Sequence, residues 1–396
     1  MIVEVTGTHT RNKGAELMLV AIREHFADRP EVQLAVDQFF GAYIERAKYR
    51  LLQKVELNGW GRSRIAMTLM PLEFRRSFGL VRDDDVDVLL DASGFAFGDQ
   101  HPPERSIQFA EDVEAAKRSG KKVVLLPQAL GPFEVSAIRD AFVRIVDAAD
   151  LIYARDEVSL EYAQEAAGNP AHLRQAPDFT NLVAPELSSN SDVSDLACIV
   201  PNRRMIEKVK TTEKADAYVP FMGRCVEAVE AAGLTPVLLL HQEEDDKLAS
   251  DIQDHVGRTI PVHQKDDPVT LKQFLGESHL VVGSRFHALV AALSQGVPAI
   301  GTSWSHKYEM LFEEYECSEM LLSVAAEEKK IEAGVSAATG ERRTELTDRI
   351  RTAGVQLEKE TASMWREVDD LIFGHKKPSE MGKGGGKEEA GTKLAP

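Results

Sequence analysis

Short apolar runs rich in valine, isoleucine and leucine recur along this 396-residue chain, and each is followed by a turn and a segment with helical periodicity. Strands buried on both faces have this uninterrupted apolar character, and strands that alternate with helices build parallel sheets covered by helices. The pattern therefore predicts an α/β fold of Rossmann-like units. It is clearest in "MIVEVTG" before "AELMLVAIREHFA", in "KKVVLLPQALGPF" before "EVSAIRDAFVRIVDAA", and in "LIYAR" before "DEVSLEYAQEAAG".

The alternation of strand-like and helix-like segments is interrupted once and then resumes, which predicts two domains. The segment "VAPELSSNSDVSD" has the composition of a linker, which we place at residues 186–195. Because single cores stop growing at roughly 250 residues, we expect Rossmann-like domains at residues 1–185 and 196–335, facing each other across a cleft. Residues 336–374 carry apolar side chains at helical spacing and predict amphipathic helices that pack on a domain. Residues 375–396 are almost without apolar side chains and are expected to be disordered.

The acidic net charge of the chain limits the classes of molecule that it can bind. The formal net charge is -17, so the long-range field repels nucleic acid and anionic lipid, and any anionic substrate must be held by local cations. The three cysteines, Cys198, Cys225 and Cys317, lie far apart without CxxC spacing. This spacing supports neither a disulfide framework nor a structural zinc site.

The sequence predicts no segment that inserts into a membrane. The N-terminus lacks the features of a signal peptide, and no uncharged apolar run approaches the ~20 residues that span a bilayer. We therefore expect a cytoplasmic protein with at most peripheral membrane contact. Residues 41–80 mix Arg and Lys with large apolar side chains. They are either a patch that faces a membrane or acceptor or, the favoured interpretation, a helical insertion whose apolar side packs inward.

The stretch "VVGSRFHALVAALSQGVPAIG" predicts a strand, a turn and a helix of small residues, with an arginine and a histidine at the turn. Ser284 can cap the helix, Arg285 offers a fork for carboxylate or phosphate, and His287 can donate a proton near neutral pH. Turns at the carboxyl ends of parallel strands are where α/β sheets bind ligands. The alternative is a structural ion pair and a core histidine.

Other cations follow strands of the second domain. Arg203 and Arg204 end the run "IVPNRRM", and because side chains alternate along a strand, we expect only one of them to face the cleft. The alternative for the other is a salt bridge between the domains. His306 and Lys307 follow a later strand, at a typical place for a phosphate contact.

The N-terminal half offers polar groups for an acceptor. The loop "GTHTRNKGAELMLVAI" is not a Walker motif, because Lys13 precedes the glycine, and no GxGxxG is present at this turn. Asn12 and Glu16 could instead hold sugar hydroxyls, although Glu16 at a helix start also has a purely structural explanation. Ser93 and Gly94 follow another strand and could line the cleft. No cluster of residues demands a metal.

These stretches together resemble the polysaccharide pyruvyl transferase family. The resemblance rests on "NKGAE", "LLDASGFAFGD", "LPQALGPF", "IYARDEVSLEYAQEAAG" with "APDF", and above all "VVGSRFHALVAALSQGVPAIG" with "SHKYEMLFEEY". They occur in the family's order over roughly residues 7–315. The resemblance implies two domains like those of the glycosyltransferase-B fold, with the acceptor on the N-terminal side and the donor on the C-terminal side. It also implies transfer of pyruvate from phosphoenolpyruvate to a saccharide, usually as a cyclic ketal, in polysaccharide biosynthesis.

The resemblance also implies roles for residues, with Arg285 and His287 binding or activating the donor and Arg203 joining them. In the mechanism that we expect, His287 is the acid and Glu16 or Asp91 takes the hydroxyl proton. Phosphoenolpyruvate is the donor substrate, and no metal or other cofactor is expected. Two positions depart from the family, since Ala15 replaces the usual Asp and only Gly94 remains of a glycine-rich turn. The donor site would comprise Arg203, Ser284, Arg285, Phe286, His287 and Lys307.

Two other functions stay open from the sequence. One is a nucleotide-sugar-dependent glycosyltransferase of the same architecture, because a fold does not fix a function. The other is a catalytically silent saccharide-binding protein, to which the two departures give some weight, although pyruvyl transfer remains the first interpretation. The sequence leaves open whether the protein is a homo-oligomer.

Overall fold

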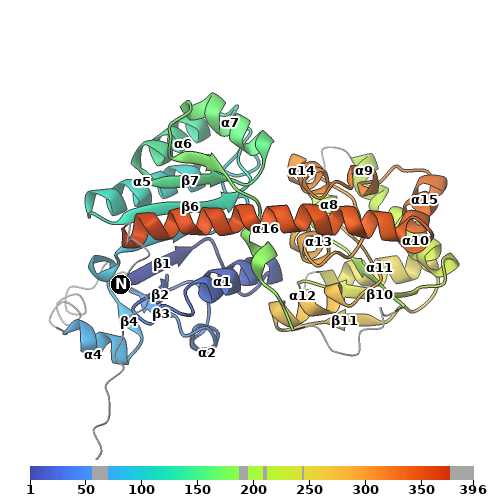
Figure 1. Ribbon diagram of the computed structural model, residues 1–396, viewed down its shortest axis with the longest axis horizontal. Coiled ribbons are helices and arrows are strands. Elements are labelled where there is room, and N and C mark those ends of the chain that lie inside the picture. Colours follow the sequence, from blue (N-terminus) through green and yellow to red (C-terminus); the bar gives the residue numbers. More distant parts are fainter. Residues whose placement is uncertain (56–69, 187–194, 208–211, 243–244, 375–396) are drawn as a thin grey trace, which may run out of the picture.

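Two parallel sheets, each covered by helices, form the protein, which confirms the predicted fold class (Figure 1). The computed structural model describes residues 1–55, 70–186, 195–207, 212–242 and 245–374. The neighbouring strands of both sheets pair in parallel.

The first sheet has the strand order β4-β3-β2-β1-β5-β6-β7-β8. Its strands are β1 (Ile2–Thr6), β2 (Gln33–Val36), β3 (Leu52–Lys54), β4 (Leu80–Val81), β5 (Val88–Asp91), β6 (Lys122–Gln128), β7 (Leu151–Ala154) and β8 (Leu173–Gln175). Its helices are α1 (Lys13–His25), α2 (Tyr43–Lys48), α4 (Leu72–Ser77), α5 (Pro103–Arg118), α6 (Ser136–Ala148) and α7 (Glu157–Ala167), with the 3-10 turns η1 (Asp83–Asp85) and η2 (Phe179–Leu182).

The second sheet has the order β11-β10-β9-β12-β13. Its strands are β9 (Leu196–Val200), β10 (Thr235–Leu240), β11 (Val262–Gln264), β12 (Leu280–Gly283) and β13 (Ala299–Gly301). The helices of this half are α8 (Arg204–Glu207), α9 (Thr212–Asp216), α10 (Tyr218–Ala231), α11 (Asp246–Val256), α12 (Pro268–Gly276), α13 (Phe286–Leu293), α14 (His306–Glu314), α15 (Glu328–Thr339) and α16 (Arg343–Phe373), with the 3-10 turn η4 (Ser318–Met320).

Each sheet reverses its strand order at one point. In the first sheet the chain runs outward from β1 in one direction and from β5 in the other, and in the second sheet the same reversal separates β9 from β12. The loops that leave the carboxyl ends of strands diverge at such a point and open a crevice for ligands. The fold therefore provides two facing crevices.

Residues 41–80 differ from the predicted helical insertion. Within this segment β3 and β4 extend the first sheet, and α2 and α4 lie beside them, while residues 56–69 are outside the described part. Tyr43 and Ile44 are 74% and 73% exposed, and Phe74 and Phe78 are also exposed. The expectation that the apolar side of this segment packs inward is therefore wrong for these side chains.

Helix α16 runs along both halves of the molecule (Figure 1). At 31 residues it is about 46 Å long. The sequence predicts amphipathic helices that pack on a domain, and this helix packs on both halves because it contributes to both cores. Its side chains in the second core are Leu346, Ile350 and Leu357, and those in the first are Met364, Trp365, Val368 and Ile372.

The predicted domain limits stay a prediction. Most of the linker at 186–195 and the whole tail at 375–396 lie outside the described residues. Among the helices that the structure describes, none has the length and apolar character needed to cross a membrane.

Candidate active site

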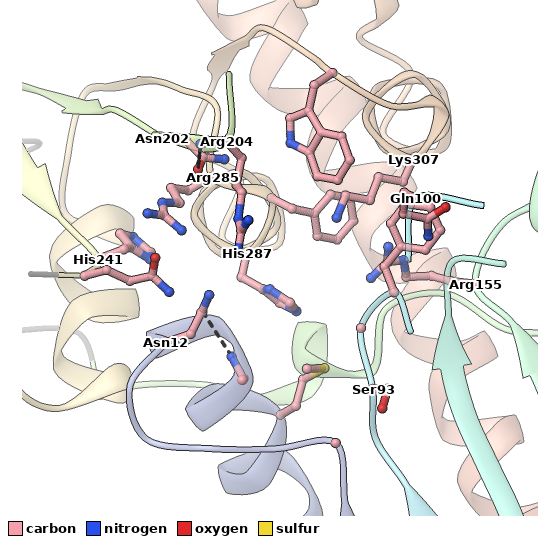
Figure 2. A pocket seen from close by; sticks show the side chains of 18 of the residues that line it. Asn12, Ser93, Gln100, Arg155, Asn202, Arg204, His241, Arg285, His287 and Lys307 are labelled. Atoms are coloured by element: carbon pink, nitrogen blue, oxygen red, sulfur yellow. Dashed lines mark hydrogen bonds between the residues drawn. The ribbon is translucent and has the colours of Figure 1, made fainter. Parts of the chain in front are cut away.

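A cavity of about 420 Å³ lies where the two crevices meet (Figure 2). It is lined by the loops that follow β1, β5 and β7 in the first sheet and β9, β10, β12 and β13 in the second. Both halves of the chain therefore contribute to one site. Its size falls within the range of small-molecule pockets, roughly 300–1,000 Å³.

The lining of this cavity is cationic, although the whole chain is acidic. No aspartate or glutamate lines it among the described residues, whereas five cations do: Arg105, Arg155, Arg204, Arg285 and Lys307. Figure 2 shows Arg155 and Lys307 on one side of His287, and Arg204, Arg285 and His241 on the other. Such a cavity suits a ligand with more than one anionic group.

Arg285 is placed in the cavity, as the sequence predicts, and is held rigidly. It is the N-cap residue of α13, it is buried, and its Nη2 donates to a carboxylate oxygen of the fully buried Asp245. Its Nε has no partner among the described residues. The Asp245 carboxylate therefore fixes one edge of the guanidinium, whereas its Nε is buried without a hydrogen bond from the described residues.

His287, also predicted, lies at the centre of the site. Its Nε2 is 3.5 Å from Oδ2 of Asp178, which belongs to the first half of the chain. Its ring packs against Gly14 so closely that a Cβ there would lie 2.3 Å from Nδ1. Burial, only partly opposed by Asp178, lowers the pKa of His287 to about 4. The free protein therefore holds a neutral imidazole at this position near neutral pH.

Arg155 and Asp178 are site residues that the sequence reasoning missed. Arg155 lines the cavity, and its Nη1 donates to Asp178 Oδ2 at 3.3 Å. Its Cζ lies 4.1 Å from the centroid of the Phe286 ring, and its Nη2 has no partner in the described part of the chain. Burial alone would raise the pKa of Asp178, but His287, which is protonated at the acidic pH where Asp178 titrates, and Arg155 hold it below its usual value.

A signal for both residues was present in the sequence. Arg155 directly follows the strand run "LIYA", and Asp178 lies three residues after the end of β8. His241, another missed lining residue, directly follows β10. Polar residues at the carboxyl ends of parallel strands converge on one edge of the sheet. Burial and the charge of Arg285 lower the pKa of His241 to about 3, so this histidine is also neutral.

Phe286 and Lys307 line the cavity, as expected. The Phe286 ring lies between two cations, with Lys307 Nζ 5.1 Å from its centroid. Aromatic faces stabilise cations at such distances.

Two predicted donor residues do not line the cavity. Arg203 is 53% exposed, and its Nε lies 2.8 Å from Glu207 Oε1, while Arg204 lines the cavity instead. The reason is that the strand ends at Val200 and α8 begins at Arg204, so strand alternation does not decide which side chain faces inward. The structure therefore places Arg204, and not Arg203, at the cavity.

Ser284 is fully buried behind the site. Its hydroxyl hydrogen-bonds with the hydroxyl of Tyr218 at 2.5 Å, and its carbonyl accepts from Asn202 Nδ2 at 2.6 Å and from Tyr308 at 2.8 Å. It does not cap α13, because Arg285 occupies the N-cap position. Ser284 therefore fixes the loop that carries Arg285 and does not line the cavity.

On the N-terminal side, Asn12, Ser93 and Gly94 line the cavity, as expected. Asn12 is the N-cap of α1, and its Oδ1 accepts from the backbone N–H of Gly14 at 2.8 Å. Its Nδ2 has no partner among the described residues and remains a donor for a ligand oxygen.

Glu16, the other expected acceptor residue, is buried away from the cavity. Its carboxylate accepts from Lys13 at 2.7 Å, from Lys48 at 3.2 Å and from the hydroxyl of Tyr49. Glu16 therefore binds the ammonium groups of Lys13 in α1 and Lys48 in α2. Lys48 also lies 3.3 Å from Asp267 of the second half, so this cluster helps to join the two halves.

Asp91, the other expected base, is also buried outside the lining. It accepts from Thr6 Oγ1 at 3.0 Å, from Ser93 Oγ at 2.9 Å and from Gln128 Nε2 at 2.9 Å. Burial raises its pKa. It ties the ends of β1, β5 and β6 together, and neither of the two expected bases reaches the cavity.

Within the described ranges, no group of three or more histidine, cysteine, aspartate or glutamate side chains could hold a metal ion.

Comparisons with known proteins agree with the fold and identify a family. The family model for polysaccharide pyruvyl transferase matches residues 12–306. No curated protein matches the chain.

Among solved structures, the chain is similar to Anabaena HepE in complex with UDP-glucose, with a TM-score of 0.58 and 13% identity over 94% of this chain and 99% of that chain. It is also similar to the UDP-GlcNAc 2-epimerase from Neisseria meningitidis bound to UDP-GlcNAc, with a TM-score of 0.56 and 10% identity over 95% and 100%. A glycosyltransferase from Rickettsia africae ESF-5 gives a TM-score of 0.57 and 10% identity over 94% and 98%. At these identities the likeness shows the glycosyltransferase-B type of fold alone.

Proposed function

Because this chain belongs to the polysaccharide pyruvyl transferase family, we propose that it moves the pyruvyl group of phosphoenolpyruvate to two hydroxyls of a saccharide, which become a cyclic ketal. The observation that carries the proposal is the cavity lined by five arginine and lysine side chains and, among the described residues, by no carboxylate. Phosphoenolpyruvate has a carboxylate and a phosphate group, and its binding requires such a surplus of cations.

The donor is held by Arg285, Arg155 and Lys307 around His287. Each arginine is oriented by a buried aspartate, and one N–H of each, Nε of Arg285 and Nη2 of Arg155, has no hydrogen-bond partner within the described part of the chain. Preorganised donors of this kind lose little side-chain entropy when they bind an anion, and they stabilise charge that develops on a departing phosphate.

The saccharide enters from the N-terminal side. Asn12, Ser93 and Gly94 line this side of the cavity and carry no charge, which suits sugar hydroxyls better than an anion. The reaction that we propose uses phosphoenolpyruvate as a substrate and needs no metal or other cofactor.

Calorimetric titration tests the proposal. Wild-type protein is titrated with phosphoenolpyruvate, UDP and GDP, beside Arg285→Ala and the matched control Arg203→Ala, whose side chain is outside the cavity. Phosphoenolpyruvate should bind, and Arg285→Ala should weaken it by about tenfold to more than a hundredfold because a charge-assisted contact is lost. The control should bind like the wild type, and phosphate should be released once a suitable saccharide is added.

Other outcomes separate the alternatives. Binding of UDP or GDP without binding of phosphoenolpyruvate would replace the proposal by a nucleotide-sugar-dependent glycosyltransferase. Binding of phosphoenolpyruvate without phosphate release, over a broad panel of saccharides, would favour a catalytically silent binding protein.

A further inference from the structure

Lys307 occupies an unusual place for a lysine. It lies in the first turn of α14 and lines the cavity, with its Nζ enclosed by aromatic rings. The ring centroids lie at 5.3 Å for Phe95, 5.1 Å for Phe286, 5.0 Å for Trp304 and 5.6 Å for Tyr308. Aromatic faces tolerate an ammonium group, but they neutralise no charge.

No carboxylate of the described residues forms an ion pair with this lysine. Arg155 and Arg285 each have a buried aspartate partner, whereas Lys307 has no ion pair or hydrogen bond among the described residues. The positive end of the α14 dipole also disfavours an ammonium group in the first turn. A cation in this position is therefore available both to an anion and for loss of its proton.

The surroundings make the proton of Lys307 easy to release. Burial and the positive charge of Arg155 lower its pKa to about 7, against partial opposition from Asp178 and Asp156. The titratable and charged groups that face it from the neighbouring elements are Arg155, Asp156, Asp178, His287 and His306. A general acid works best when its pKa lies near the working pH.

His287 has the complementary property. The sequence predicts His287 as the acid, but with a pKa of about 4 the free protein carries no proton to give on this ring near neutral pH. The neutral ring lies 3.5 Å from the Asp178 carboxylate, whose charge opposes part of the lowering of the pKa. Its unprotonated nitrogen can accept the proton of a hydroxyl that becomes strongly acidic as it adds to an oxocarbenium-like carbon.

We propose that Lys307 is the catalytic acid that protonates the methylene carbon of phosphoenolpyruvate, and that His287 is the base that receives the proton of the attacking saccharide hydroxyl. This inference rests on the proposed function and assigns its proton transfers.

The atoms and protons balance along this route. Lys307 gives a proton to C3 as the double-bond electrons form the new C–H bond, and C2 becomes an oxocarbenium-like centre. The first hydroxyl adds to C2, and its proton passes to His287. The bond from C2 to the phosphate oxygen then breaks, phosphate leaves with the electron pair, and the second hydroxyl adds to C2 to close the ketal. One hydroxyl proton restores Lys307, and the other leaves with inorganic phosphate.

Two lysine variants test the acid. Lys307→Arg keeps the positive charge but replaces the donor by a guanidinium, which does not release its proton in proteins. It should bind phosphoenolpyruvate within about threefold of the wild type, while kcat falls by about 100- to 10,000-fold. The matched control is Lys265→Arg, because Lys265 also lies over an aromatic ring, 4.8 Å from the Phe274 centroid, but outside the cavity lining.

Lys307→Ala distinguishes an acid from a positioning group. Phosphate release is measured against pH with the saccharide that reacts fastest in a panel of methyl glycosides and UDP-linked sugars. In the wild type, kcat/KM should fall above about pH 7, where the free acid loses its proton. Added methylamine should restore turnover to Lys307→Ala and move this alkaline limb toward the pKa of methylamine.

The outcomes separate the inference from the proposed function. Wild-type turnover in Lys307→Arg, or an alkaline limb that stays near pH 7 in Lys307→Ala, would overturn the role of Lys307 and leave pyruvyl transfer intact. A wild-type protein that binds no phosphoenolpyruvate would overturn the proposed function as well.

Discussion

Replacing Gly14 by alanine tests whether the position of His287 matters for turnover. Gly14 lies in the first turn of α1, and a Cβ at this position would lie 2.3 Å from Nδ1, 2.7 Å from Cγ and 2.9 Å from Cβ of His287. Ordinary van der Waals contact begins at 3.4 Å. Because the clash includes the Cβ of the histidine, rotation of the ring alone does not relieve it, and His287 must move by about 1 Å.

The expected effect on catalysis exceeds that on stability. A misplacement of about 1 Å lowers turnover by roughly a hundredfold. In a helix, alanine gains roughly 0.5–1 kcal/mol over glycine, whereas overpacking costs about 1–3 kcal/mol. Gly14→Ala should therefore lose at most about 2.5 kcal/mol of unfolding free energy. The affinity for phosphoenolpyruvate should change little, because Arg285 and Arg155 keep their aspartate partners.

The assay compares Gly14→Ala with Gly354→Ala, in which the new Cβ meets Tyr315 Cε1 at an ordinary 3.6 Å. Phosphate release gives kcat, and urea unfolding gives stability. The control should gain about 0.5–1 kcal/mol and keep its turnover. A kcat of Gly14→Ala within about twofold of the wild type would refute the steric reasoning.

Arg204→Ala removes a guanidinium that lines the cavity, and calorimetry should show about tenfold weaker binding of phosphoenolpyruvate. Arg203→Ala should bind like the wild type, because this side chain lies outside the cavity. Equal losses in the two variants would contradict this placement of the side chains. Burial lowers the pKa of His287 from 6.5 to about 4. Between pH 6.5 and 4 the unfolded chain therefore binds more protons than the folded protein. The unfolding free energy should fall by about 3 kcal/mol as the pH is lowered from 6.5 to 4. His287→Asn should flatten that dependence in urea unfolding, and an unchanged slope would assign it to other groups. In the wild type, Lys272 Nζ donates to the Thr180 carbonyl at 2.8 Å, and Lys272→Met removes this donor. The unfolding free energy should fall by about 1–2 kcal/mol. Unchanged thermal and urea midpoints would exclude this loss.

The sequence predicted the part of the site that lies within one βα unit. Arg285, Phe286 and His287 follow one strand directly, and their turn must lie at the carboxyl edge of the sheet. Local order is enough for this inference, because the end of a parallel strand fixes the position of the residue that follows it.

Residues whose role depends on a second element were harder to predict. Glu16 has the spacing of a site residue, but α2 brings Lys48 and Tyr49 over its carboxylate. Arg203 and Arg204 exchange roles because the chain turns into α8 within a few residues of β9. In both cases the partner that decides the orientation of a side chain is not visible in the local pattern.

The sequence by itself determined two parallel α/β units and a cationic turn at Arg285, because hydrophobic periodicity and strand ends are local properties of a chain. Only the tertiary structure decided that Asp178 from one half lies beside His287 from the other, and that four aromatic rings enclose Lys307. Burial and neighbouring charges determine which of these groups carries a proton, and both arise only when distant segments pack together.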